Sequence, residues 1–297
     1  MSVYNTTGKV VALQLGASVQ AVNTKLLVQG PTTIIGHMQG AVFMERGTAQ
    51  FIGPFTARNN QGKMLGLVYV RATFHSSFVC DQDTKPSQAV PAPNTELSTV
   101  CISAVLSNLD FRNTVTATNN LCTDWTAPVL DCYFSDVRFR GHAQFSGNAR
   151  KRAWSIYLQA TGSVSDEDSG GGAWQVRDCR IVADKGVGFY NNIAIAVTPA
   201  PGVTYGAGGA VSARNSSLVF KGGLEVVGNE APRGGGLFLV GSFLRVSGGS
   251  FVCQDNVAAR QGGCMYAMGP GYDMSPPPWG LGSVILWSST SSCVQNN

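Results

Sequence analysis

The tetrapeptide Gly208-Gly209-Ala210-Val211 returns twice farther along the chain, as Gly235-Gly236-Leu237-Phe238 and as Gly262-Gly263-Cys264-Met265. Their starting positions are equally spaced, with a step of 27 in the numbering (235 − 208 and 262 − 235). A fixed period between about 20 and 50 residues is the signature of a solenoid, in which each repeat packs on the next. The tetrapeptides therefore predict a stack of similar structural units in this part of the chain.

The segments between these tetrapeptides repeat with nearly the same period. Segment 224–229, LEVVGN, matches segment 251–256, FVCQDN, at the same step of 27 (251 − 224). Segment 216–223 matches segment 242–249 at a step of 26 (242 − 216), as happens when a turn gains or loses one position. Each unit contains short apolar stretches divided by Gly, Asn or Ser, and strands this short are stable only when they pair with neighbours.

Two solenoids have a period in this range, the leucine-rich repeat and the parallel β-helix. The repeats of this chain lack the regularly spaced leucines and the helical segment of a leucine-rich repeat. A β-helix would bury alternate side chains and pair every backbone edge with the next coil. We therefore predict an all-β fold, a right-handed parallel β-helix with three strands per coil and a coil length of 26–27.

Weaker echoes of the repeat extend toward the N-terminus. Segment 47–51, GTAQF, is similar to segment 141–145, GHAQF. We therefore expect a single β-helix domain over residues 1–297, a module of a larger assembly. Proline-rich or glycine-rich segments predict loops extruded from the coils at 81–100, 163–172 and 269–282.

The repeat also predicts which residues stack on each other in consecutive coils. Asn229 and Asn256 are expected at a turn, each hydrogen-bonded to its equivalent one coil away. Val226 is expected against Cys253 in the core. The predicted stacks of the tetrapeptides are Gly209, Gly236 and Gly263 at one corner, and Val211, Phe238 and Met265 in one ladder.

Composition excludes several classes of protein. The 297 residues include 36 Gly and 44% apolar residues but only 13% charged ones, which is too little charge for a disordered chain and unusual for a helical one. The net charge of +4 comes without a run of Lys or Arg, so nucleic acid is not an expected partner. No apolar run approaches the roughly 18 residues of a membrane span.

Paired glycines followed by small and aliphatic residues suggest a family. The repeat resembles those of chlamydial polymorphic outer membrane proteins, which also occur in large surface proteins of algae and protists. Gly208-Gly209-Ala210-Val211 is similar to their Gly-Gly-Ala-aliphatic motif, and Phe145-Ser146-Gly147-Asn148 to their Phe-x-x-Asn motif. The resemblance implies a β-helical module that is surface-exposed or adhesive.

Eight cysteines without a Cys-x-x-Cys pair are a poor zinc pattern and an acceptable set of disulfides. Two bonds would close proline-rich loops and a third would join the next most local pair. The expected pairs are Cys80–Cys101, Cys264–Cys293 and Cys122–Cys132.

Two Asn-x-Ser/Thr sequons, at Asn5 and Asn215, are candidate glycosylation sites. The first residues are polar and carry no secretion signal, so the chain is either cytosolic or a processed or internal piece of a larger protein. The cysteines favour the second alternative. We therefore expect an extracellular or cell-surface location, including a surface appendage.

Catalysis on a β-helix would require clustered acids and bases on one face. The nearest approach to such a cluster is Asp178 and Asp184 beside Arg177 and Arg180. We expect no catalytic residues, no metal site and no cofactor. Ca²⁺ at the acidic segment 166–168 is the one alternative, although that segment lacks the spacing of an EF-hand loop.

Arg233 and Arg260 are separated by the same step of 27 (260 − 233), so we expect them to stack on one face. They are the candidate contacts for an acidic glycan or a partner carboxylate. The sequence thus predicts a non-catalytic structural or adhesive module that contacts other surface or matrix proteins or glycans. The alternative is a polysaccharide lyase, hydrolase or epimerase on a pectin lyase-like fold.

Overall fold

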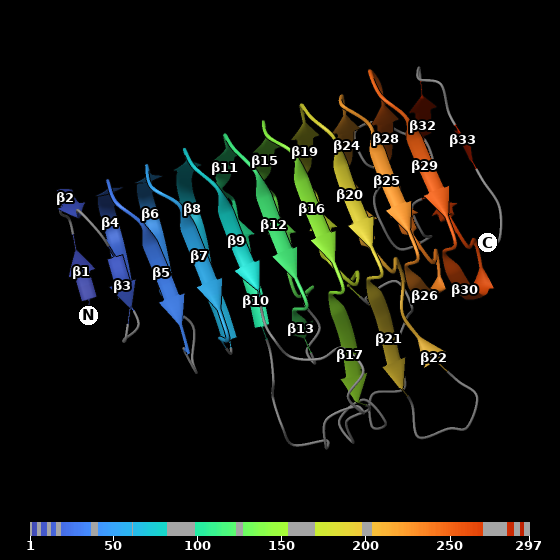
Figure 1. Cartoon of the computed structure of the whole chain (residues 1–297), viewed down its shortest axis with the longest axis horizontal. Coiled ribbons are helices and arrows are strands. Elements are labelled where there is room, and N and C mark those ends of the chain that lie inside the picture. The colour runs from blue at the N-terminus through green and yellow to red at the C-terminus, as the bar shows by residue number, and fades with distance from the viewer. Residues whose placement is uncertain are drawn as a thin grey trace.

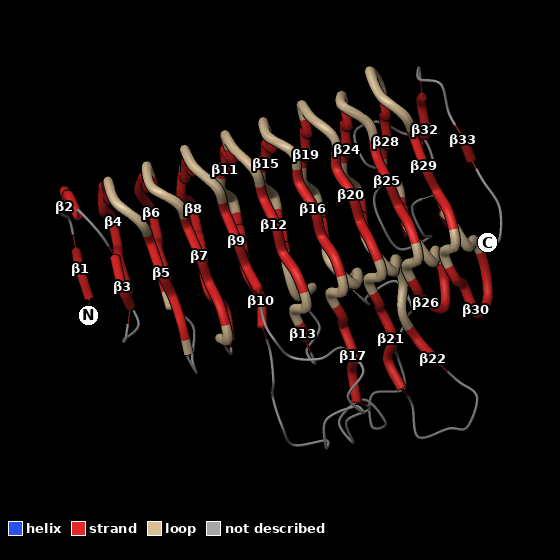
Figure 2. The backbone as a smooth tube through the Cα atoms, viewed as in Figure 1, coloured by secondary structure: helices blue, strands red, loops and turns tan. Residues whose placement is uncertain are grey.

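The chain forms an elongated stack of short strands in which consecutive coils lie side by side (Figure 1). The computed structural model describes residues 2–4, 7–10, 13–15, 19–36, 41–60, 62–81, 99–122, 127–153, 170–197, 204–269, 284–287 and 292–293. In this part of the chain, strands are joined by short turns and no helix occurs (Figure 2). All of its strand pairs are parallel except β21–β22. The predicted all-β parallel β-helix is confirmed.

The strands belong to three sheets, which we call A, B and C. Sheet A contains β1 (Ser2–Tyr4), β2 (Thr7–Val10), β4 (Val19–Val28), β6 (Val42–Phe51), β8 (Gly62–Phe74), β10 (Thr99–Val105), β11 (Asn108–Phe111), β14 (Leu130–Tyr133), β15 (Asp136–Phe139), β18 (Trp174–Arg177), β19 (Arg180–Ala183), β23 (Val211–Arg214), β24 (Ser217–Phe220), β27 (Leu237–Val240), β28 (Phe243–Val246), β31 (Met265–Met268) and β32 (Val284–Trp287).

Sheet B contains β3 (Leu13–Leu15), β5 (Thr32–Ile35), β7 (Phe55–Arg58), β9 (Phe78–Asp81), β12 (Val115–Thr118), β16 (Ala143–Ser146), β20 (Val187–Tyr190), β25 (Leu224–Val227), β29 (Phe251–Gln254) and β33 (Ser292–Cys293). Sheet C contains β13 (Leu121–Cys122), β17 (Ala149–Ala153), β21 (Ile193–Val197), β22 (Thr204–Tyr205), β26 (Glu230–Arg233) and β30 (Val257–Gln261).

Sheet A is divided lengthwise by a corner. From β10 onward each coil contributes two strands to the sheet, such as β10 and then β11, separated by a short bend. The strands β4, β6 and β8 run through both halves. We call the half that contains β10, β14 and β18 A1, and the half that contains β11, β15 and β19 A2.

Coil length varies along the chain. Leu218 pairs with Leu244, a step of 26 in the numbering, and Val226 pairs with Cys253, a step of 27, as the sequence predicts. Phe55, in contrast, pairs with Phe78 at a step of only 23. In the described part of that coil, β7 leads directly to β8 without a strand in sheet C, which accounts for the shorter length.

The tetrapeptides are one position out of the predicted register. Val211 pairs with Leu237, not with Phe238, and Leu237 pairs with Met265. These steps of 26 and 28 add up to two steps of 27, so the sequence spacing conceals the slip. The predicted corner of Gly209, Gly236 and Gly263 is therefore wrong, because Gly236 lies level with Ala210.

Aromatic rings fill the centre of the stack. Phe51, Phe74, Phe111 and Phe139 lie on one another in successive coils, with ring centroids 4.7–5.1 Å apart. The next residue in that register is Ala183, which is too small to continue the stack. Trp174 from the A1 half lies over Phe139 at 5.3 Å instead and is fully buried.

A ladder of buried asparagines fixes the turn between sheets B and C. Asn120 donates from Nδ2 to Oδ1 of Asn148 at 2.8 Å, and the same bond joins Asn148, Asn192, Asn229 and Asn256 in sequence at 2.9 Å. Each of these residues is 0% exposed. Buried amides need such partners because an unpaired polar group is costly. The predicted bond between Asn229 and Asn256 is confirmed.

A second polar ladder lines the corner between A1 and A2. The backbone N–H of Ser107 donates to Oγ of Ser135 at 2.9 Å, and that of Cys179 donates to Oγ of Ser216 at 3.1 Å. The N–H of Ser216 likewise donates to Oγ of Ser242 at 3.2 Å. These hydroxyls satisfy backbone groups that the bend removes from ordinary strand pairing.

Three disulfides join the coils, and they indicate an oxidising environment. The Cys80–Cys101 bond is present, as predicted. The other two predicted pairs, Cys122–Cys132 and Cys264–Cys293, are wrong, because Cys132 bonds Cys179 and Cys264 bonds Cys253. Cys122 is buried and belongs to none of these bonds. Stacking places Cys132 beside the distant Cys179, so the local partner fails there, whereas Cys264 bonds a cysteine that is only 11 positions away in sequence.

Candidate functional site

Charged side chains gather on the outer surface of the A2 half. Along each A2 strand the second and fourth residues point into the core, as Leu109 and Phe111 do, so the first and third face solvent. The residue after each strand also faces outward. We call the following set the charged face: Arg71, Asp110, Arg112, Asp136, Arg138, Arg140, Arg180, Asp184 and Lys221.

Ion pairs on the charged face run both within a coil and between coils. Asp110 accepts hydrogen bonds from Arg112 at 3.1 Å and from Arg140, one coil away, at 2.6 Å. Asp184 accepts from Arg138 at 2.8 Å and from Lys221 at 3.0 Å. Each of these carboxylates thus lies between two cations.

These contacts set the protonation states on the charged face. Burial opposes ionisation of Asp110 and Asp184, but hydrogen bonds from their Arg and Lys partners outweigh it and hold the pKa of each carboxyl below its ordinary value. The pKa of the neighbouring His75 is lowered, first by burial and then by Arg112. The carboxylates therefore stay ionised and the imidazole stays neutral near pH 7.

The charged face has an excess of positive charge, since five arginines and one lysine face three aspartates. A shallow hollow of about 440 Å³ lies over it. Arg71 and Arg180 line this hollow, and the structure gives neither an ion pair within the described residues. An anionic ligand would meet guanidinium groups that can donate bidentate hydrogen bonds.

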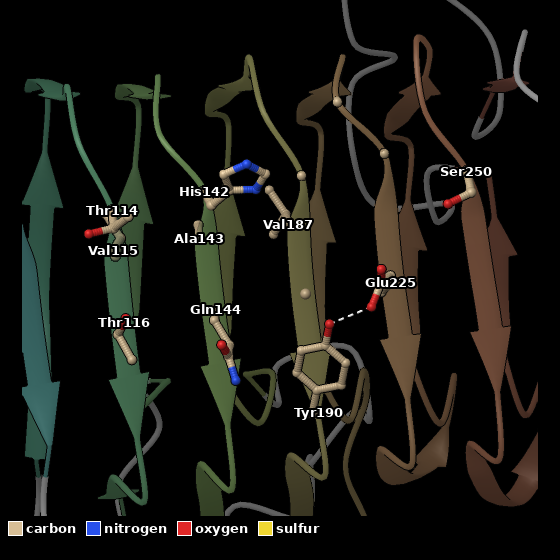
Figure 3. A pocket seen from close by; sticks show the side chains of 14 residues that line it. Thr114, Val115, Thr116, His142, Ala143, Gln144, Val187, Tyr190, Glu225 and Ser250 are labelled. Atoms are coloured by element: carbon tan, nitrogen blue, oxygen red, sulfur yellow. Dashed lines mark hydrogen bonds between the residues drawn. The ribbon is translucent and has the colours of Figure 1, made fainter.

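A second hollow, of about 340 Å³, lies on the outer surface of sheet B. Figure 3 shows Gln144, Tyr190 and Glu225 projecting from three neighbouring strands on the same side. Gly188 has no side chain to fill the surface, and the Tyr190 ring lies so close over it that a Cβ there would collide with the ring. The result is a polar depression with one aromatic ring in its floor.

Tyr190 donates a hydrogen bond to the carboxylate of Glu225 (Figure 3). Burial, with help from this bond and the carboxylate charge, raises the pKa of Tyr190 to about 12. Its hydroxyl therefore remains protonated near neutral pH and cannot serve as a base. Glu225 is the only carboxylate among the residues that line this hollow.

The structure separates the two arginines that the sequence places on one face. Arg233 pairs with Gln261, not with Arg260, because the pairing of β26 with β30 shifts between Ala231 and Arg233. The predicted Arg233–Arg260 stack is therefore wrong. Both residues lie on sheet C, away from the two hollows.

The acids and bases considered for catalysis are also dispersed. Asp178 lies at the A1–A2 corner with a φ of 53°, and Arg177 lies over the Tyr133 ring, with its guanidinium carbon 5.7 Å from the centroid. Asp184 belongs to the charged face, where its carboxylate accepts two hydrogen bonds. Of the four residues, only Asp184 and Arg180 contribute to the charged face.

The structure describes only some of the remaining predicted sites. Asn215 is half-buried at the A1–A2 corner with a φ of 48°. Asn5, the side chain of Cys293, the acidic segment 166–168 and the greater part of the three predicted loops lie outside the described residues. Within those that are described, no three His, Cys, Asp or Glu side chains form a group that could hold a metal ion.

No helix of the described chain is both long and apolar enough to cross a bilayer. The chain matches no known family model, no curated protein and no solved structure.

The charged face was not identified from the sequence, although a signal for it exists. The tetrapeptides Leu109-Asp110-Phe111-Arg112 and Val137-Arg138-Phe139-Arg140 share one pattern at a step of 28 in the numbering (137 − 109). The next member of the series, Ile181-Val182-Ala183-Asp184, follows only after a step of 44 (181 − 137). The residues inserted into this coil, which lengthen the step from 28 to 44, hide the periodicity.

Proposed function

We propose that this chain is a non-catalytic adhesive module of an extracellular or cell-surface assembly. Its charged face would contact polymers that bear carboxylate or sulfate groups, such as acidic glycans. The observation that carries this proposal is the excess of positive charge on A2, with Arg71 and Arg180 not engaged in ion pairs among the described residues.

Two further features support an extracellular adhesive role. Disulfides persist in oxidising compartments, where a stack of coils benefits from covalent links between distant segments. A rigid stack also presents its cations at the fixed coil spacing of about 4.8 Å. Regularly spaced cations suit a repeating polymer better than a small molecule.

A binding role is favoured over hydrolysis by the state of the carboxylates. Glycoside hydrolysis requires a carboxyl group held protonated by a raised pKa, together with a second carboxylate. On the charged face the pKa of Asp110 and that of Asp184 are both lowered. In the hollow of sheet B, Glu225 has no carboxylate partner among the lining residues.

Binding of heparin and of polygalacturonate, measured by calorimetry at several salt concentrations, tests the proposal. We expect binding that weakens as salt increases, because exposed charges are screened. The variant Arg71→Gln/Arg180→Gln should lose at least about tenfold in affinity, since each removed cation costs a charge-assisted contact. The control Arg58→Gln removes an exposed cation from sheet B and should leave the affinity unchanged.

The enzymatic alternative is tested in the same samples. A lyase would produce unsaturated sugar ends that absorb in the ultraviolet, and a hydrolase would release reducing ends. We expect neither product. Product formation that Glu225→Gln or Asp184→Asn abolishes would overturn the non-catalytic role, and absence of binding to both polymers would overturn the anionic ligand.

A further inference from the structure

Three large apolar side chains are exposed side by side at the A1–A2 corner. Tyr69, Leu106 and Phe134 occupy the same corner position in consecutive coils, as the pairing of the residues on both sides of them shows. Their exposed fractions are 53%, 43% and 59%. We call this row the apolar ridge.

The backbone at the apolar ridge adopts a conformation that disfavours such residues. The φ angles of Tyr69, Leu106 and Phe134 are 55°, 50° and 48°. Bulky side chains rarely occupy this left-handed region, whereas Asn, Asp and Gly tolerate it. Four other coils hold these expected types at the corner, namely Asn23, Asp178, Asn215 and Gly241.

Strained residues with exposed apolar side chains indicate an interaction surface. Strain of this kind persists where it serves a function. Burial in the core cannot be that function, because the three side chains face solvent. The backbone strain at the apolar ridge is therefore offset by contact with a partner that covers the three side chains.

The two ends of the apolar ridge carry opposite charges. Arg46 occupies the corner position one coil before Tyr69, and Asp178 occupies it one coil after Phe134. Arg46 is well exposed, and its ion pair with Glu45 is a long contact of 3.8 Å. Read along the stack, the row is cationic, apolar, apolar, apolar and anionic.

Such a row is complementary to itself when reversed. A twofold axis through Leu106 would place Arg46 of one copy opposite Asp178 of the other, twice. It would also place Tyr69 opposite Phe134, and Leu106 opposite its own equivalent. This reciprocal arrangement is the defining property of an isologous interface.

We propose that the apolar ridge joins two copies of this chain in an antiparallel dimer. The interface consists of the apolar ridge, closed at each end by an Arg46–Asp178 ion pair between copies. This association is independent of the charged face, because none of its five residues belongs to the set that would contact acidic glycans.

Sedimentation velocity over a range of protein concentrations tests the dimer. We expect reversible self-association for the natural sequence. The variant Tyr69→Asn/Leu106→Asn/Phe134→Asn should be monomeric at every concentration. Since Asn is tolerated at this corner, the monomeric variant should melt at the same or a higher temperature, which separates loss of the interface from loss of the fold.

Charge reversal tests the antiparallel geometry. Arg46→Asp and Asp178→Arg should each weaken self-association by about tenfold or more, because like charges then face each other twice. An equimolar mixture of the two variants should restore the dimer. In the mixed dimer both acidic side chains belong to the Arg46→Asp copy and both basic ones to the Asp178→Arg copy, so each end again pairs one acid with one base.

Three results would overturn the proposal. The first is a natural chain that stays monomeric at the highest concentration measured. The second is a dimer that persists in the triple Asn variant. The third is a mixture of the charge-reversed variants that fails to associate.

Discussion

At the scale of single residues, the structure depends on a few positions where consecutive coils come very close. Gly236 is one of them. A Cβ on this residue would stand 2.5 Å from Cγ1 of Val226 and 2.6 Å from the carbonyl oxygen of Cys264. Neither atom can move away easily, because Val226 is packed in the core and the Cys264 carbonyl accepts a hydrogen bond from the backbone N–H of Leu237.

We therefore expect Gly236→Ala to lower the free energy of unfolding by about 1–3 kcal/mol, the usual cost of overpacking. Gly186→Ala is the matched control, since its Cβ would find only ordinary contacts, the nearest at 3.4 Å from His142. Urea unfolding of both variants decides the matter, and equal midpoints would contradict the packing described for Gly236. Gly170 would not serve as a control, because it is buried and its carbonyl accepts a hydrogen bond from Arg150.

At the scale of strands, the charged face connects neighbouring members of the A2 half through its carboxylates. Asp110 links β11 to Arg140, which follows β15, and Asp184 links Arg138 of β15 to Lys221, which follows β24. Both carboxylates have lowered pKa values in the folded chain. The folded state therefore binds protons less readily than the unfolded state, whose carboxyls titrate near 3.8.

The stabilisation from these carboxylates is present in full at pH values above the pKa of the unfolded state. It is lost as the pH falls through their folded pKa values. Asp110→Asn/Asp184→Asn should therefore reduce stability at pH 6, by up to about 1 kcal/mol per exposed pair. It should also make the fall in stability below pH 4 shallower. Unfolding free energies measured from pH 6 to pH 3 test this, with Asp136→Asn as the control on the same face. A double variant with the natural acid slope would show that the pairs contribute nothing.

The same strands show how far sequence reasoning reaches. Val226 and Cys253 could be matched because the turns between them keep their length, and the asparagine turn could be recognised because Asn follows a residue suited to positive φ. The register of Phe238 could not be predicted, because the spacings of 26 and 28 between paired residues add up to two spacings of 27. Asp184 and Arg138 meet across an insertion, so no fixed period could have joined them.

At the scale of the whole molecule, each coil contacts chiefly the coil before it and the coil after it. The stability of such a stack is approximately a sum of coil and interface contributions. Removing one complete coil should therefore leave a shorter but intact stack. Residues 217–242 form such a unit, because Ser217 pairs with Phe243 and deletion would bring Ser216 directly before Phe243.

We expect the chain lacking residues 217–242 to fold and to melt cooperatively. Its core remains continuous because Asn192 would donate to Asn256, and Val187 would pair with Phe251. Deleting only residues 217–229 should prevent folding, since it joins the A1 half to sheet C and removes one strand from the A2 half and one from sheet B. Circular dichroism melts and small-angle scattering distinguish the outcomes, with the intact stack shortened by about 4.8 Å. Two unfolded deletions would refute the modular description.

The asparagine ladder also gives the molecule a polarity. In each Asn–Asn bond from Asn120 to Asn256, Nδ2 of one residue donates to Oδ1 of the residue in the next coil toward the C-terminus, so the two faces of any coil differ at the ladder. If the stack were severed between two coils, each broken Asn–Asn bond would leave its Nδ2 donor on one new face and its Oδ1 acceptor on the other. Such faces fit head to tail and oppose each other head to head. Along its long axis the molecule is therefore directional in the way that a polymer with distinct growing and trailing ends is directional.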